Sequence, residues 1–276
     1  MFSGMEGHHM VGRNTQTKQI VTAVLSVLAM ISLLLALPLR AEEGSLEGVY
    51  MDDMRVIYPE SSRNGVISTF SNNSSNNYLI QSMVRELDSK TGLPVAVNAP
   101  FLVIPPLAKV NAHSRQVLKI LRTGGDFPRD RESAFFLNVR LLPSEQQLSV
   151  SKEQGIGRVK IVMVLMIKMF YRPEGLPKEG VTGAVKQLRV SVKKDTVTLS
   201  NLSPFWITLQ TLHVNAFAVP DKDLFRMVPP FGQQSWSLPA GNVSLGSKVT
   251  VSWRAINELG LNTDEESKSI VVSGSG

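Results

Sequence analysis

The residue types that most often carry catalysis or bind metal are scarce in this chain of 276 residues. It has no cysteine, so it offers no thiol nucleophile, disulfide framework or thiolate metal site. Its four histidines are His8 and His9 near the N-terminus and the isolated His113 and His213, and the later two lack metal-ligand spacing. A lone Gly-x-Gly at 155–157 is too short a motif to indicate a phosphate site. We therefore expect a protein that is not an enzyme and that uses no cofactor or metal.

Lys168 is the residue whose setting most strongly suggests a function. It interrupts an apolar stretch, because residues 161–167 are all hydrophobic. A strand of a two-layer sandwich normally alternates apolar and polar residues, since one face packs on the core and the other meets water. Here both faces are apolar, so either another domain covers the second face or that face is a docking surface. An unpaired charge in such a strand is costly, which favours a binding role for Lys168.

Composition indicates a folded protein without the signature of nucleic-acid binding. Hydrophobic residues make up 43% of the chain and charged residues 19%. The formal net charge is +6, but no block of five or six basic residues occurs and no basic–aromatic interleaving is present. We therefore expect no nucleic-acid partner.

The N-terminus resembles a secretory signal. Arg13 and Lys18 precede an uncharged apolar stretch at 20–39, and Ala41 follows before the chain turns acidic. This order predicts a signal peptide over 1–41 that is cleaved near Ala41. The alternative is an uncleaved membrane anchor, because the apolar stretch is nearly long enough to span a bilayer. With cleavage, no stable membrane insertion is expected.

The rest of the chain is typical of an all-β protein. Short runs rich in β-branched and aromatic residues are separated by clusters of Gly, Pro, Asn and Ser, and no helical periodicity is sustained. Such runs occur at 54–58, 66–70, 78–86, 117–121, 134–142, 188–192, 196–199, 206–219 and 248–253. A break at 172–183 with three glycines and two prolines predicts a hinge. We therefore expect two domains, at 42–175 and 176–276, each of a size that suits a β-sandwich.

Four short segments, in order along the chain, resemble periplasmic chaperones of the chaperone–usher pathway. The run Ile-Lys-Met-Phe-Tyr-Arg-Pro at 167–173 is similar to the family's signature, and Met-Arg-Val-Ile-Tyr-Pro at 54–59 to its first strand. Residues 130–140 resemble the strand before the one that the family donates to its substrate, and Asn-Leu-Ser-Pro-Phe at 201–205 a motif of its second domain. The resemblance implies two immunoglobulin-like sandwiches set at an angle.

The resemblance also implies roles for individual residues. Arg55 and Lys168 match the pair that grips the C-terminal carboxylate of a fibre subunit. For Arg55, the residues alone favour an ordinary solvated cation beside Asp52 or Asp53, and only the resemblance implies the binding role. The donor-strand side chains that the family inserts into an incomplete subunit match Val159, Ile161, Met163 and Leu165.

Lys168 has the opposite parity to these four donor residues. Either a twist or bulge re-aims it, or the even-numbered face contributes more to binding.

A further set implied by the resemblance is an ion cluster between the two domains, at Glu132, Arg172 and Glu258. The family usually has Asp at the third position. Ile104-Pro105-Pro106 resembles a family turn that favours a cis proline. The long segment between Arg140 and Val159 resembles the long-loop branch, although that branch commonly carries a cysteine pair which this chain lacks.

The resemblance thus implies a periplasmic chaperone that binds, stabilises and caps fimbrial or surface-fibre subunits by donor-strand complementation. Its partners would be those subunits and an outer-membrane usher, and the free chaperone could self-associate. The alternative function is a secreted immunoglobulin-like adhesin or structural module, which would have no need of a cation inside an apolar strand.

Overall fold

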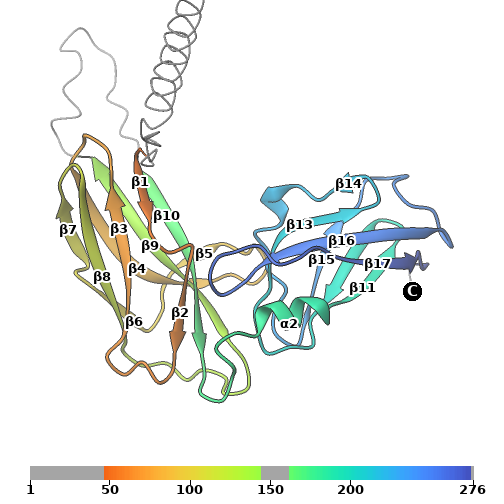
Figure 1. Cartoon of the computed structure of the whole chain (residues 1–276), viewed down its shortest axis with the longest axis horizontal. Coiled ribbons are helices and arrows are strands. Elements are labelled where there is room, and N and C mark those ends of the chain that lie inside the picture. Colours follow the sequence, from red (N-terminus) through yellow and green to blue (C-terminus); the bar gives the residue numbers. More distant parts are fainter. Residues whose placement is uncertain (1–46, 144–161, 275–276) are drawn as a thin grey trace, which may run out of the picture. The chain divides into compact units, whose positions relative to one another are not determined.

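The computed structural model describes residues 47–143 and 162–274, so the predicted signal peptide lies outside the described residues. The described chain forms two β-sandwich domains, drawn from orange to green and from teal to blue in Figure 1. This confirms the prediction of a two-domain all-β fold. No helix in the described ranges is long and apolar enough to cross a membrane.

The N-terminal domain packs a four-stranded sheet against a larger one. The four-stranded sheet has the order β1-β3-β8-β6, with β1 at Val49–Met51, β3 at Val66–Asn72, β8 at Ser114–Arg122 and β6 at Phe101–Ile104. The larger sheet has the order β2-β10-β9-β4-β5, and β7 also pairs with β4. Its strands are β2 (Arg55–Pro59), β10 (Met163–Arg172), β9 (Ser133–Pro143), β4 (Tyr78–Leu87), β5 (Pro94–Asn98) and β7 (Leu107–Val110).

The C-terminal domain has the same two-layer plan. Three strands form one sheet in the order β11-β12-β15, namely β11 (Arg189–Lys193), β12 (Thr196–Ser200) and β15 (Gln233–Ser237). Four strands form the other in the order β14-β13-β16-β17, namely β14 (Phe217–Ala218), β13 (Thr208–Val214), β16 (Lys248–Ile256) and β17 (Glu266–Val271). A 3-10 turn, η2, spans Asp221–Asp223.

The alternation of side chains along the strands decides which face enters each core. In β9, Phe135, Leu137, Val139 and Leu141 are buried between the sheets, while the even-numbered residues face outward. Successive side chains of a strand point to opposite faces, so this period-2 pattern fixes the register of β9 against its neighbours. The outward face of the larger sheet is therefore the face that carries Arg140.

Two details of the secondary structure differ from the sequence-based expectation. The predicted hinge at 172–183 contains the start of a short helix, α2 (Val181–Lys186), which buries Val181, Ala184 and Val185 against the C-terminal core. A helix of six residues is too short to show a sustained 3.6-residue pattern. The long run at 206–219 is a hairpin of β13 and β14, which turns at Asn215 with φ 53°. By contrast, the Ile104–Pro105 bond is cis, as the family resemblance implies.

We expect Gly65→Ala to destabilise the N-terminal domain more than Gly48→Ala does. Both glycines have positive φ (78° and 111°), where any L side chain is strained, at a cost of about 1–2 kcal/mol. A Cβ at Gly48 would meet nothing within 4 Å, whereas a Cβ at Gly65 would meet the Ile120 carbonyl group. Urea unfolding of both variants measures the difference. Equal losses of unfolding free energy would show that contact of a Cβ at Gly65 with the Ile120 carbonyl group does not destabilise the domain.

Candidate functional site

Lys168 and Arg55 lie side by side on the outward face of the larger sheet. Strand β10 pairs parallel with β2, and in this pairing the two residues are direct neighbours. The pairing of β10 with β9 runs without a register shift from Met163 to Tyr171. No bulge therefore re-aims Lys168 within β10, so it shares the even-numbered face with Val164, Met166 and Phe170.

Neither cation has a carboxylate partner within salt-bridge distance among the described residues. Arg55 is only 8% exposed, its Nε has no hydrogen-bond partner, and its guanidinium lies over the Phe170 ring at 5.5 Å. Burial lowers the pKa of Arg55 to about 10, against the weaker opposing attraction of Glu132 and Glu258. Burial, and then the neighbouring Arg55, lower the pKa of Lys168 to about 8. Two desolvated cations without a counter-ion form a site for an anion.

A small cavity opens beside Lys168. Its volume is about 360 Å³, and strand β13, the segment around η2 and Ile256 at the end of β16 supply the rest of its lining. Leu209, Leu224 and Phe225 make it partly apolar. Thr211, also in the lining, has a buried hydroxyl without a partner. An anion held at Lys168 could therefore have an apolar group attached to it.

Arg172, at the end of β10, lies in a buried ion cluster with Glu132 and Glu258. Its Nη2 is 2.7 Å from Glu132 Oε1 and 3.3 Å from Glu258 Oε1. Its Nη1 donates to the carbonyl oxygens of Pro177 and Lys178. The structure thus brings together the three residues that the sequence analysis grouped.

The cluster ties residues of both domains together. The backbone N–H of Trp206 donates to Glu132 Oε2 (2.9 Å), and its indole N–H donates to the Glu132 carbonyl (3.1 Å). Glu258 Oε1 accepts from the backbone N–H groups of Gly180 and Val181. Burial raises the pKa of Glu132, although Arg172 opposes this shift. The donors around both carboxylates satisfy charges that would otherwise be costly to bury.

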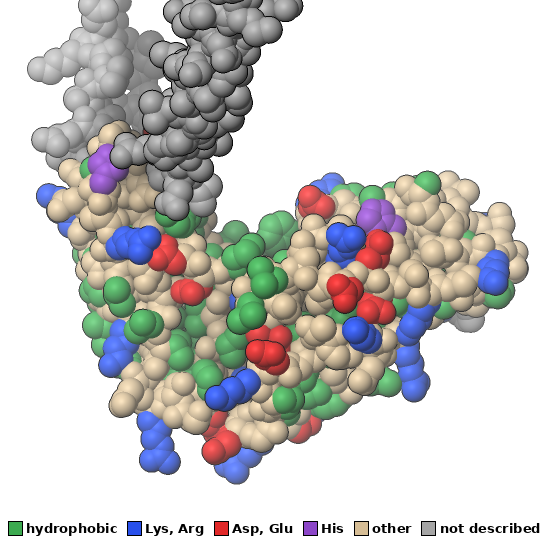
Figure 2. All heavy atoms as spheres, viewed as in Figure 1, with side chains coloured by type: hydrophobic (Ala, Val, Ile, Leu, Met, Phe, Trp, Pro, Cys, Tyr) green, Lys and Arg blue, Asp and Glu red, His purple; other side chains and the backbone are tan. Residues whose placement is uncertain are grey.

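Among the described residues, no strand pairs with the second edge of the first half of β10, which we call its free edge. Residues 163–171 pair with β9 on one side, but β2 covers the other side only from Lys168 onward. On the outward face, Val162, Val164 and Met166 are 37%, 41% and 43% exposed, and hydrophobic side chains at the surface can be seen in Figure 2. On the inward face, Leu165 and Ile167 pack against the core of the domain. The segment 163–167 therefore offers both unpaired backbone and exposed apolar side chains.

Of the four predicted donor residues, the structure describes two. Met163 is 49% exposed and Leu165 is half-buried against the chain's own core, whereas Val159 and Ile161 lie outside the described residues. The sequence analysis missed Phe170, which stacks on Arg55, and the C-terminal residues around Lys168. Phe170 and Lys168 are both even-numbered residues of β10 and so share a face, which could have indicated that Phe170 belongs to the site. No local pattern indicates the second, since those residues come from β13, β16 and the segment around η2, which are distant in the sequence.

Comparison with known proteins gives concordant matches to both domains. Residues 48–177 match the family described as pili and flagellar-assembly chaperone, PapD N-terminal domain. Residues 183–267 match the family described as pili assembly chaperone PapD, C-terminal domain.

Curated relatives and solved structures agree with these matches. A probable fimbrial chaperone, ElfD of Escherichia coli O157:H7, is 32% identical over 79% of this chain and 85% of its own length. The chaperone FimC of E. coli K12 is 28% identical over 92% and 97%. The E. coli chaperone DraB has a TM-score of 0.66 at 26% identity, over 81% and 97%. A Salmonella enterica complex of the SafA pilin with the SafB chaperone matches with a TM-score of 0.66 at 25% identity, over the same shares.

We expect Lys168→Met to stabilise the free protein near pH 7. Lys168 has a pKa of about 8 in the folded protein against 10.5 for an ordinary lysine, so below pH 8 the fold bears the full cost of the buried charge. Between pH 8 and 10.5 the folded state loses this proton before the unfolded state does, and wild-type stability should rise relative to the variant. Urea unfolding at pH 7 and pH 9.5 measures the difference, with Lys119→Met as the exposed control. If the difference in unfolding free energy between the wild type and Lys168→Met is the same at pH 7 and pH 9.5, the buried charge of Lys168 does not destabilise the fold.

Proposed function

This chain belongs to the family of pilus-assembly chaperones, and we propose that it binds and caps fimbrial subunits by lending them the free edge of β10. In this proposal it acts in the periplasm after removal of residues 1–41, and it delivers its subunits to an outer-membrane usher. The domains would be 42–175 and 176–276. Because the relatives named above are chaperones, the alternative of an adhesin is not favoured.

The observation that carries the proposal is the coincidence of two features at Lys168. The free edge of β10 ends there, because β2 pairs with the strand from that residue onward. The two cations without a counter-ion, Lys168 and Arg55, lie at the same point. A guest strand that pairs with 163–167 must stop at β2. If its last residue is the C-terminus of the subunit, its carboxylate meets both cations.

This arrangement also sets the direction of the guest strand. The guest ends at Lys168 and its preceding residues lie beside 163–167, so it runs in the same direction as β10. The pair is therefore parallel, and β10 would have a parallel partner along both parts of its second edge. The existing parallel pairing with β2 continues the same geometry beyond Lys168.

Apolar side chains of the donor strand would supply most of the binding energy. The residues proposed for insertion are Val159, Ile161, Met163 and Leu165. Burying one such side chain contributes about 1.5–3 kcal/mol. Leu165 already packs on the chain's own core, so its contribution to the guest would be smaller than that of Met163. The exposed outward residues Val164 and Met166 add apolar surface beside the guest.

The ion cluster would support binding without touching the subunit. Arg172 with Glu132 and Glu258 would keep the C-terminal domain close to Lys168, so that the cavity of about 360 Å³ stands next to the bound carboxylate. In the absence of a subunit, the free edge would remain open to a second copy of the chain, which gives a physical reason for self-association.

We expect capture of a subunit to require its free C-terminal carboxylate and a protonated Lys168. Amidation of the subunit's C-terminus should weaken binding strongly, because it removes the counter-ion of both cations. With Lys168 near a pKa of 8 in the free protein, affinity should be constant below pH 8 and fall by about tenfold per pH unit above it. Calorimetry with a refolded fimbrial subunit from pH 6.5 to 9.5 measures both effects. Equal affinity for the acid and the amide would exclude this anchor.

We expect Met163→Glu to abolish capture, because it would place a charge in the apolar groove of the subunit. Val117→Glu is a matched control, since Val117 is similarly exposed (51%) but lies in the other sheet, on β8. Recovery of a co-produced subunit from the periplasm is the measurement, and the control should retain it. If both variants capture the subunit like the wild type, another face of the molecule binds it.

A further inference from the structure

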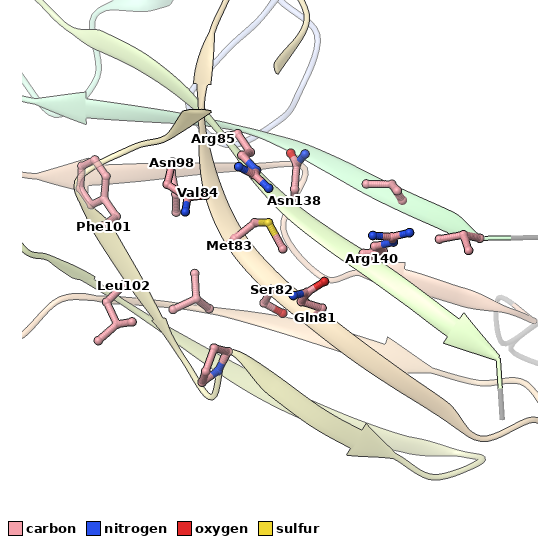
Figure 3. Close-up of a pocket in the computed structure, with 14 residues that line it drawn as sticks. Gln81, Ser82, Met83, Val84, Arg85, Asn98, Phe101, Leu102, Asn138 and Arg140 are labelled. Atoms are coloured by element: carbon pink, nitrogen blue, oxygen red, sulfur yellow. The ribbon is translucent and has the colours of Figure 1, made fainter. Parts of the chain in front are cut away.

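A second cavity lies on the outward face of the larger sheet of the N-terminal domain, apart from the cavity at Lys168. Its volume is about 790 Å³, and Figure 3 shows its lining residues. It exists because the chain changes sheets: β5 and β7 both pair with β4, whereas β6 between them pairs with β8 in the other sheet. The segment 82–84 of β4 therefore lies between two partners, and the sheet opens beside it.

The polar lining of this cavity is rich in hydrogen-bond donors and carries positive charge. Arg85 and Arg140 supply two guanidinium groups, and Gln81, Asn98 and Asn138 supply amides. No Asp or Glu occurs among the described lining residues. Arg85 donates one hydrogen bond, to the Ala96 carbonyl, and exposed Arg140 has no acceptor in the described part of the chain. This composition favours a carboxylate as the group that the cavity binds.

Two buried polar atoms in the lining have no partner. Ser82 is 3% exposed and its hydroxyl makes no hydrogen bond, and the buried Oδ1 of Asn138 accepts none. Ser82 pairs with Val139 and lies on the inward face of β4, whereas Asn138 shares the outward face with Arg140. Buried polar groups are almost always paired, so the unpaired Asn138 oxygen on the outward face favours an occupant there. The Asn138 oxygen needs a donor, whereas the arginines need an acceptor. A peptide segment with an acidic side chain offers both, since its backbone supplies N–H groups and its carboxylate supplies the acceptors.

The cavity extends across the outward face of the sheet from β4 and β9 as far as β10. Val162 and Val164 belong to its lining, and Val164 pairs with Arg140, which in turn pairs with Gln81. A guest at the free edge lies on the side of β10 away from β9, so β10 separates its backbone from that of Arg140 by two strand spacings, about 10 Å. An acidic side chain of the guest that reaches across Val164 on the outward face would meet the Arg140 guanidinium. Apolar side chains of the wall, among them Met83 and Leu102, can pack against the methylene groups of an acidic side chain.

We propose that this cavity receives an Asp or Glu side chain of the captured subunit and helps the chaperone to select its subunits. This inference rests on the proposed function, and it adds a second charged contact to the one at Lys168 and Arg55. Because Arg140 lies at an exposed position, its charge should act mainly on the rate of association.

The first test uses a defined probe and needs no subunit. Titration of the full chain with N-acetyl-glutamate methylamide should shift the NMR signals of Asn138 and Arg140, and the glutamine analogue should not. The shifts should disappear in Arg140→Gln and persist in Lys119→Gln, a control with an exposed cation on β8. Equal shifts with the neutral analogue, or shifts confined to Arg55 and Lys168, would overturn the inference.

The second test uses a fimbrial subunit that the wild-type chain captures. Arg140→Glu should slow association about tenfold at low salt, and the difference should shrink as salt increases. Lys119→Glu changes the net charge equally and should leave the rate near that of the wild type. Equal rates for the two variants would refute the inference while leaving the anchor at Lys168 intact. Loss of capture by Lys168→Ala alone would then still support the proposed function.

Discussion

The parallel pairing of β2 with the second half of β10 is the constraint on which the candidate site depends. It begins at Lys168, and within the described ranges residues 163–167 pair with β9 alone. The same pairing brings Arg55 next to Lys168, because residues opposite each other in a sheet share a face. One register thus determines where the open edge ends and where the positive charge lies. A shift of one residue would move Arg55 to the core side.

Charges of opposite sign lie near Arg55 but not in contact with it. Glu132 and Glu258 favour the charged form of Arg55, although their direct partner is Arg172. Burial has the opposite effect and is the stronger influence on Arg55 and Lys168. The cluster at Arg172 is neutralised by contacts within the chain, whereas the pair at Lys168 is not. This contrast separates the ion cluster at Arg172 from the proposed binding site at Lys168, although both contain arginine.

The sequence predicted the fold class and the residues around the cations better than it predicted the binding faces. Apolar runs bounded by turn residues indicated most strands, and Lys168 within an apolar strand indicated a charge that needs a partner. The proximity of Arg55 came from resemblance, since no local pattern shows which distant strand will pair with β10. The helix α2 was missed because six residues give no periodicity. The sequence did not indicate the cavities, since they depend on a strand that changes sheets and on strands and a 3-10 turn of the other domain.

The contacts of Trp206 with Glu132 make each domain depend on the other when one of them is produced alone. A fragment that ended near residue 175 would lose both N–H donors of Trp206, the carboxylate of Glu258 and the two carbonyl acceptors of Arg172. Its buried ion pair would then be short of partners on both sides. The two sandwiches are therefore poor candidates for independent production. A chimera that exchanges one of them with a relative would need to carry Trp206 and Glu258 in the same positions.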